Sequence, residues 1–167
     1  MLVSWMGRYR GIVEALVQHG NCCIRAANYM MNMSDGITLT AQEWQVLEYI
    51  IEHEDNDHNM TKLSERLCIP QSSFSKMTGK LFKYGLLEKY RIVGNKKCVI
   101  LKASESGKTF YLKNAEVINQ YVFDVFFREL EGFSDEQLAQ FVRAINTVDE
   151  RMPGSKGKQQ LVKIDTQ

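Results

Sequence analysis

The hydrophobic period changes several times between residues 60 and 103, and the order of these changes restricts the fold more than any other feature of the chain. A short helical pattern that Thr61 can cap is interrupted at Pro70, because proline disfavours the helical conformation of the residue before it. A second helical pattern starts at once, over residues 71–84, and Gly85 stands where a glycine commonly ends a helix. The sequence therefore predicts two helices joined by a tight turn.

The period then becomes that of β-strands. Residues 86–93 and 97–103 are predicted as two strands, and the intervening Gly94, Asn95 and Lys96 are typical of a β-hairpin turn. Two helices with a tight turn, followed directly by a hairpin, make up a winged helix-turn-helix, in which the hairpin is the wing.

Helical patterns flank this segment on both sides. Apolar residues at steps of three and four predict a long amphipathic helix over residues 8–33. Thr40 and Glu43 form a capping box that opens a second helix, which runs to about Glu54.

Two more helices are predicted beyond the hairpin. Ser104 or Ser106 can open a long helix, and Ser134 with Gln137 forms a capping box for another. Glycine, proline and lysine are frequent after residue 152, which predicts a mobile tail. The predicted fold is mainly α-helical with a small β-hairpin.

Length and composition exclude several classes of protein. The chain has 167 residues, of which 44% are hydrophobic and 25% charged, as in an ordinary globular domain. No apolar stretch approaches the roughly 20 residues that cross a bilayer, and residues 1–9 lack the apolar core of a signal peptide. We expect a cytoplasmic protein without a membrane partner.

The sequence contains no pattern of an enzyme or a metalloprotein. No nucleophile elbow, glycine-rich phosphate loop or metal triad is present, so neither catalytic residues nor a cofactor is expected. The four cysteines follow neither a disulfide nor a zinc-knuckle spacing, so we expect no metal site and mostly buried, free thiols.

The net charge of +1 hides a strong segregation of sign. Residues 61–97 contain nine basic and two acidic residues, a net charge of +7, and the rest of the chain contains twelve basic and eighteen acidic residues, a net charge of −6. One cationic region on an otherwise anionic chain indicates a surface that binds a polyanion.

The predicted helix 71–84 has the composition of a helix that lies in the major groove of double-stranded DNA, with an apolar back and a small, polar and cationic front. Residues in its N-terminal half are the candidates for contacts with bases: Gln71, Ser72, Ser73, Ser75 and Lys76. Lys80 and Lys83 are expected to contact phosphates, as are Arg91, Lys96 and Lys97 on the hairpin.

Several segments resemble the MarR family of bacterial transcription regulators. The similarity lies in residues 60–76 and 81–89, in Leu39-Thr-Ala-Gln-Glu-Trp before them, and in Leu101-Lys-Ala-Ser-Glu-Ser-Gly-Lys after the hairpin. The resemblance implies a homodimeric repressor that binds a pseudo-palindromic site and is released by a small-molecule effector or an oxidant. It also implies four parts: an N-terminal dimerisation helix at 1–38, a DNA-binding domain at 39–103, C-terminal dimerisation helices at 104–151, and the tail at 152–167.

The tip of the wing departs from the family pattern. The family commonly has Asp-Arg-Arg where this chain has Asn95-Lys96-Lys97. Lysine is a flexible point charge and lacks the planar fork of arginine, so we expect this wing to contact phosphates more than to enter the minor groove.

Two other hypotheses remain open at this stage. Cys22 and Cys23 lie one helical turn from His19, which would suit a regulator that senses thiol oxidation. A winged helix can also bind a protein in place of DNA, because a fold alone does not fix a function. The operator, the regulated genes, the effector and the direction of regulation are not encoded in any recognisable pattern.

Overall fold

The computed structural model describes residues 4–54, 59–92 and 95–151. The chain forms two compact units, Met1–Asn114 and Ala115–Gln167. The predicted tail at 152–167 lies outside the described residues, as do Gly94 and the side chains of Lys96 and Lys97. No helix in the described ranges is long and apolar enough to cross a membrane.

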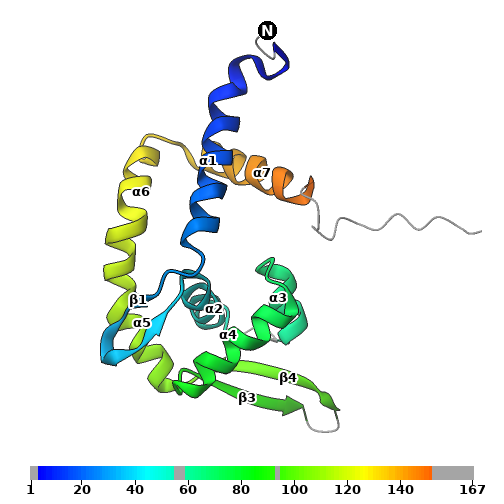
Figure 1. The fold of residues 1–167 in the computed structure, drawn as a ribbon, viewed down its shortest axis with the longest axis vertical. Helices are drawn as coiled ribbons and strands as arrows, with labels where there is room; N and C mark the ends of the chain where they lie inside the picture. The colour runs from blue at the N-terminus through cyan, green and yellow to red at the C-terminus, as the bar shows by residue number, and fades with distance from the viewer. Residues whose placement is uncertain (1–3, 55–58, 93–94, 152–167) are drawn as a thin grey trace, which may run out of the picture. The chain divides into compact units, whose positions relative to one another are not determined.

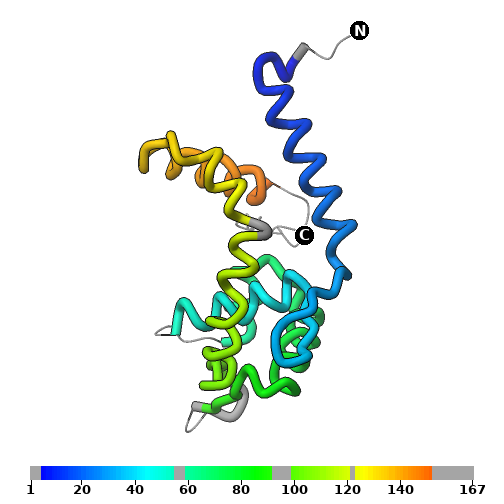
Figure 2. The backbone as a smooth tube through the Cα atoms, turned by 90° about the vertical axis from the view of Figure 1, so that its left-hand side faces the viewer, coloured from blue at the N-terminus to red at the C-terminus, as the bar shows by residue number. Residues whose placement is uncertain are grey.

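The first unit begins with the predicted long helix. A short hairpin that the sequence did not predict follows it. The elements are the 3-10 turn η1 (Ser4–Tyr9), α1 (Arg10–Ala26), β1 (Met31–Asn32), the 3-10 turn η2 (Ser34–Gly36) and β2 (Thr38–Leu39). Figures 1 and 2 show α1 as one continuous helix that leads into this short hairpin.

The predicted helix over 8–33 is therefore wrong in its last turns, because α1 ends at Ala26. Met31 pairs with Leu39 in an antiparallel ladder, and Asp35 and Gly36 turn the chain with positive φ angles. The backbone N–H of Ser34 donates to Oδ1 of Asn114, 80 residues away. Tertiary contacts thus override the helical spacing of the methionines in this segment.

The winged helix follows, and its elements agree with the prediction. They are α2 (Ala41–Glu52), α3 (Met60–Arg66), α4 (Gln71–Lys83), β3 (Leu87–Ile92) and β4 (Asn95–Ala103), with β3 and β4 antiparallel. The predicted capping box is present, since the side chain of Thr40 accepts from the backbone of Glu43 and the side chain of Glu43 accepts from that of Thr40. One cap was assigned wrongly: α3 is capped by Asn59, whose side chain accepts from the backbone N–H of Thr61.

The core of this unit lies among α2, α4, the wing and the start of α5 (Glu105–Ile118). Its buried members come from all of these elements and from β2: Leu39, Val46, Leu47, Ile50, Phe74, Leu81, Leu86, Leu87, Leu101 and Phe110. Gly85 ends α4 with a φ of 71°, as a C-terminal glycine does, and turns the chain into β3.

The start of α5 is clamped to the turn between α4 and β3. The hydroxyl groups of Ser104 and Ser106 both donate to the carbonyl oxygen of Gly85, at 2.5 and 2.7 Å. Gly107 lies so close to Leu86 that a Cβ atom would stand 2.1 Å from the Leu86 carbonyl oxygen. The first turns of α5, through Asn114, therefore belong to the same unit as the winged helix.

The second unit contains the end of α5, the π-helical segment η3 (Asn119–Phe123), α6 (Asp124–Leu130) and α7 (Asp135–Arg151). The capping box predicted at Ser134 and Gln137 is present before α7. Phe126 of α6 and Phe141 of α7 are in ring contact, but no described side chain of α6 or α7 is buried.

Candidate DNA-binding surface

Helix α4 is held in the winged helix by its apolar side. Phe74, Thr78 and Leu81 are buried on that side. The buried hydroxyl of Thr78 donates to the carbonyl oxygens of Phe74 and Ser75 in its own helix, so its burial leaves no unsatisfied donor. The opposite side of α4 is thereby turned to solvent.

Most of the residues predicted to contact bases lie on this outer side. Gln71, Ser72, Ser75 and Lys76 are exposed, and Ser73 is half-buried. No hydrogen bond or ion pair ties the Lys76 ammonium to another described residue. The front of α4 is thus small in its side chains, polar and cationic, as contact with base edges requires.

A polar pocket of about 490 Å³ opens beside the N-terminal end of α4. Its walls come from α4, from the start of α3 and from β4: Asn59, Met60, Thr61, Gln71, Ser72, Ser75 and Val99. The amide of Gln71 donates to the hydroxyl of Thr61 at 3.3 Å. Thr61 therefore belongs to the candidate surface, although the sequence predicted only a helix-capping role for it.

The turn between α3 and α4 contains a residue in a strained conformation. Cys68 has a φ of 51°, in the left-handed region that residues with a side chain rarely adopt. The backbone N–H groups of Cys68 and Ile69 donate to Glu65 and Ser64, which closes the turn. This closure sets the angle between α3 and α4.

The wing presents part of the predicted cationic surface. Arg91 is exposed on β3 opposite Val99, and no described residue pairs with its guanidinium. The Lys89 ammonium lies 4.8 Å from the ring centre of Phe82, at the end of α4. The backbones of Lys96 and Lys97 both lie in β4, which begins at Asn95. The prediction that Asn95 and Lys96 belong to the hairpin turn is therefore wrong, because the second strand starts two residues earlier than the sequence indicated.

Lys80 and Lys83 differ in their surroundings although both were predicted to contact phosphates. Lys83 is exposed and forms no ion pair with a described residue. The Nζ atom of Lys80 lies 2.7 Å from Oε2 of Glu43 on α2, and only 28% of its side chain is exposed. Lys80 is therefore bound within the fold.

Three acidic residues of the described segment before α3 are in contact with side chains of α5. Lys113 binds Asp35 and Lys108 binds Glu54, and these contacts hold the pKa of both carboxyl groups below the usual range. The hydroxyl of Tyr111 donates to Glu48 at 3.2 Å, where burial raises the pKa of the carboxyl group. The basic residues of α5 thus offset the negative charge of the segment before the helix-turn-helix.

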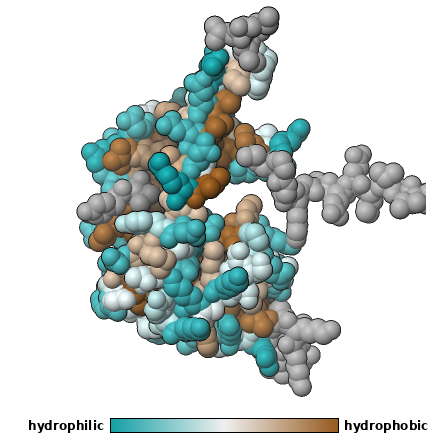
Figure 3. All heavy atoms as spheres, in the orientation of Figure 1, coloured by the Kyte–Doolittle hydropathy of each residue, from teal (hydrophilic) through white to brown (hydrophobic). Residues whose placement is uncertain are grey.

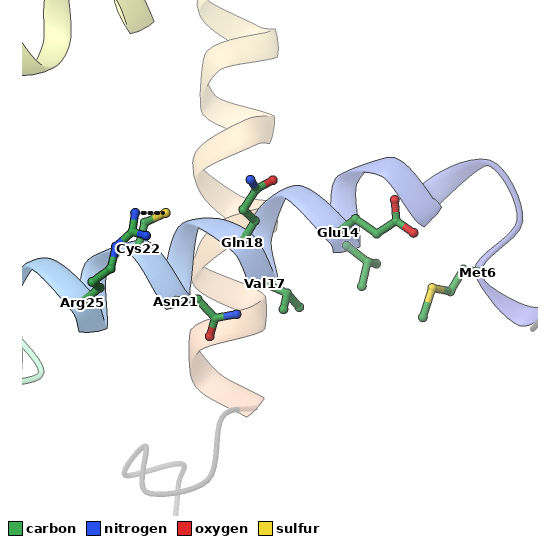
Figure 4. Close-up of a pocket in the computed structure, with 8 residues that line it drawn as sticks. Met6, Glu14, Val17, Gln18, Asn21, Cys22 and Arg25 are labelled. Atoms are coloured by element: carbon green, nitrogen blue, oxygen red, sulfur yellow. Dashed lines mark hydrogen bonds between the residues drawn. The ribbon is translucent and has the colours of Figure 1, made fainter.

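The two adjacent cysteines lie on α1, and the expectation that they are buried is wrong for this chain. Cys22, Cys23 and also Cys68 are exposed. The Sγ atom of Cys23 lies 3.4 Å from Nε2 of His19, and the guanidinium of Arg25 donates to the Sγ atom of Cys22 at 3.7 Å (Figure 4). The described residues contain no cluster of three potential metal ligands.

The comparisons with known proteins agree with this geometry. The model of the MarR family matches residues 39–99, whereas no curated protein matches the chain. Among solved structures, a MarR/EmrR family regulator from Acinetobacter sp. ADP1 is similar with a TM-score of 0.58 and 16% identity, over 84% of this chain and 92% of that one.

Two further structures are similar over most of their length. A cysteine-to-serine mutant of ZitR from Lactococcus lactis, in complex with DNA, has a TM-score of 0.57 and 17% identity, over 86% of this chain and 98% of that one. PcaV from Streptomyces coelicolor, a transcriptional regulator in complex with its natural ligand, has a TM-score of 0.53 and 14% identity, over 90% and 97%. The model of the MarR family thus matches the segment that forms the winged helix-turn-helix, and the solved structures share the fold of this chain.

Proposed function

We propose that the protein is a ligand-responsive repressor that binds a pseudo-palindromic DNA site as a homodimer, with α4 of each protomer in a major groove. The observation that carries the proposal is the exposed, cationic front of α4 beside the polar pocket, in a domain that matches the family model. The hydroxyl and amide groups of Gln71, Ser72 and Ser75 can bond to base edges or phosphates there. Arg91 and the lysines of the wing add contacts to the DNA backbone.

The amphipathic helices support the dimer. No described side chain of α1 is buried, although Ile12 and Ile24 are apolar and 61% and 75% exposed. Brown, apolar side chains lie exposed along α1 in Figure 3. Apolar surface of this extent is usually covered by a partner, and the exposed apolar residues of α6 and α7 have the same need.

A groove on α1 fits a second helix better than a small ligand. It measures about 630 Å³ and is lined only by residues of η1 and α1: Met6, Val13, Glu14, Val17, Gln18, Asn21, Cys22 and Arg25 (Figure 4). A ligand pocket normally encloses most of its ligand, which the face of a single helix cannot do. We assign this groove to the dimer and leave the effector without an assigned site.

The test of DNA binding compares two lysines of the same helix. Fluorescence anisotropy would measure binding to a labelled duplex from the region upstream of the protein's own gene and to a scrambled duplex, over a series of salt concentrations. Lys76→Ala is expected to lower the preference for the first duplex by roughly tenfold. Lys83→Ala should weaken both complexes alike and reduce the salt slope by about 1.8, because the dimer loses one phosphate contact in each protomer.

Salt-independent binding, or no binding to any duplex, would contradict the proposal and favour a winged helix that binds protein. Equal effects of the two substitutions would contradict the assignment of base contacts to the N-terminal half of α4 and of phosphate contacts to its C-terminal end. Sedimentation of the unaltered protein measures its molar mass in solution, which should be that of a dimer. The double variant Ile12→Glu, Ile24→Glu is expected to sediment as a monomer.

A second candidate is a switch driven by thiol oxidation. Cys22 and Cys23 are both exposed on α1 of the single chain, and Cys22 lines the groove assigned to the dimer, so an oxidised Cys22 would disturb the packing of the partner helix. Peroxide should then lower the DNA affinity of the unaltered protein and leave that of the Cys22→Ser, Cys23→Ser double variant unchanged. Unchanged affinity after complete oxidation would remove this candidate.

A further inference from the structure

An ion pair joins α4 to the N-terminal end of α2. Nζ of Lys80 lies 2.7 Å from Oε2 of Glu43, and the two side chains are 28% and 10% exposed. Because most of both side chains is withdrawn from water, solvent screens this pair less than it screens a surface ion pair. The contact spans 37 positions of sequence and crosses from one helix to another.

The carboxylate of Glu43 is fixed independently of Lys80. Its Oε2 atom also accepts from the backbone N–H of Thr40 at 2.8 Å, while the backbone N–H of Glu43 donates to the hydroxyl of Thr40 at 3.2 Å. The carboxylate lies in the first turn of α2, where the helix dipole favours a negative charge. Glu43 therefore offers Lys80 an anchor whose place is set by α2.

The other contacts of α4 do little to fix the orientation of this helix relative to its neighbours. Phe74 and Leu81 pack through apolar contacts, which are not directional. Thr78 bonds within α4 itself and so does not fix the helix to a neighbour. Among the side-chain contacts of the described residues, directional bonds from α4 to other helices run from Gln71 to Thr61 at one end and from Lys80 to Glu43 toward the other.

We propose that Lys80 is a positioning residue for DNA recognition: it stays bound to Glu43 when the protein binds DNA and sets the angle at which α4 presents Gln71 and Lys76 to the bases. The inference rests on the proposed function and replaces the expectation that Lys80 contacts a phosphate. Were Lys80 to turn to a phosphate, the carboxylate of Glu43 would be left largely buried, without its cation and close to DNA. Lys83 has no such partner among the described residues and remains free to contact the phosphate backbone of DNA.

The two roles of Lys80 predict opposite effects of neutralising Glu43. Glu43→Gln keeps the capping bond to Thr40, because glutamine serves the capping box as well, but removes the charge that holds Lys80. In the positioning role α4 loses its anchor, so discrimination between sequences falls. In the phosphate role Lys80 is released toward DNA, so affinity rises for every sequence.

The experiment uses full-length protein, the upstream and scrambled duplexes and the same salt series. Lys80→Gln and Glu43→Gln are each expected to lower the preference for the upstream duplex by roughly tenfold, with the salt slope unchanged. The double variant should be no worse than either single variant, since both remove the same contact. Lys80→Arg, which keeps the charge and can reach Glu43, should restore the preference.

Lys83→Gln is the matched control, expected to reduce the salt slope by about 1.8 for the two protomers with the preference unchanged. Three results would overturn this inference and leave the proposed function intact. They are a reduced salt slope with unchanged preference for Lys80→Gln, an increased affinity for Glu43→Gln, or no change in either variant. If the unaltered protein bound no duplex, the proposed function and this inference would both fall. Circular dichroism and thermal unfolding of each variant verify that a lost preference does not reflect a lost fold.

Discussion

Gly107 gives the sharpest test of how the wing is joined to the rest of the first unit. It lies in the first turn of α5, and a Cβ atom there would stand 2.1 Å from the carbonyl oxygen of Leu86 and 3.0 Å from its carbonyl carbon. Cβ atoms in proteins essentially never approach another atom within 3.0 Å, so Gly107→Ala must displace one backbone segment by about 1 Å.

The cost follows from what that displacement breaks. The Leu86 oxygen accepts from the backbone N–H of Ser104 at 3.1 Å, in a buried region. Losing a buried hydrogen bond costs about 1–3 kcal/mol, and overpacking adds about 1–3 kcal/mol. The higher helix propensity of alanine relative to glycine offsets about 1 kcal/mol of this loss. We expect a loss of about 3 kcal/mol in the free energy of unfolding, and a fall in Tm of roughly 10 °C for a chain of this size.

Urea unfolding, followed by the fluorescence of the buried Trp44 at fixed protein concentration, measures this loss. Gly79→Ala is the matched control, because Gly79 lies inside α4 and a Cβ atom there would meet nothing within 4 Å. The control should gain about 0.5–1 kcal/mol. A Gly107→Ala variant as stable as the unaltered protein would refute the close approach on which the argument rests.

Two smaller predictions concern single side chains. Burial and the carboxylates of Glu48 and Glu52 raise the pKa of Tyr111 to about 12, so its contribution to stability is present below pH 10 and is lost as the pH rises toward 12. Tyr111→Phe should make the unfolding free energy less dependent on pH in that interval, and ultraviolet titration should lose its late-titrating tyrosine. Cys68→Gly removes a side chain from a left-handed position and should raise the unfolding free energy by up to about 1 kcal/mol, as urea unfolding would measure, whereas a decrease would show that the thiol itself stabilises the turn.

The sequence predicted best those elements whose boundaries are set by local chemistry. The capping boxes at Thr40 and Ser134 are both present, and α4 begins at Gln71 and ends one residue before the predicted end. Gly85 ends that helix as expected. In each of these cases a backbone donor, a backbone acceptor or a φ angle is satisfied by residues within a few positions, so a window of sequence holds all the information.

The predictions failed where distant residues decide the outcome. The apolar residues before Ser34 have a spacing that suits a helix, yet pairing with Leu39 and the bond to Asn114 make the segment a hairpin. The cap of α3 was placed two residues late because Asn59 and Thr61 are both good capping residues, and only the actual start of the helix at Met60 selects between them. The burial expected for the thiols assumed that the apolar face of α1 packs within its own chain.

The sequence gives the correct number of basic residues in the window 61–97, but it does not show how many of them are free on the surface. The window contains nine basic residues, but Lys80 is bound to Glu43, and Arg66 and Lys89 lie over the rings of Tyr49 and Phe82. A cation held by a carboxylate or over an aromatic ring must give up that contact before it can neutralise a phosphate. If the protein binds DNA as proposed, the number of phosphates that one chain neutralises is therefore expected to be smaller than the number of basic residues in the window. The salt dependence of DNA binding should then follow the free cations of α4 and the wing.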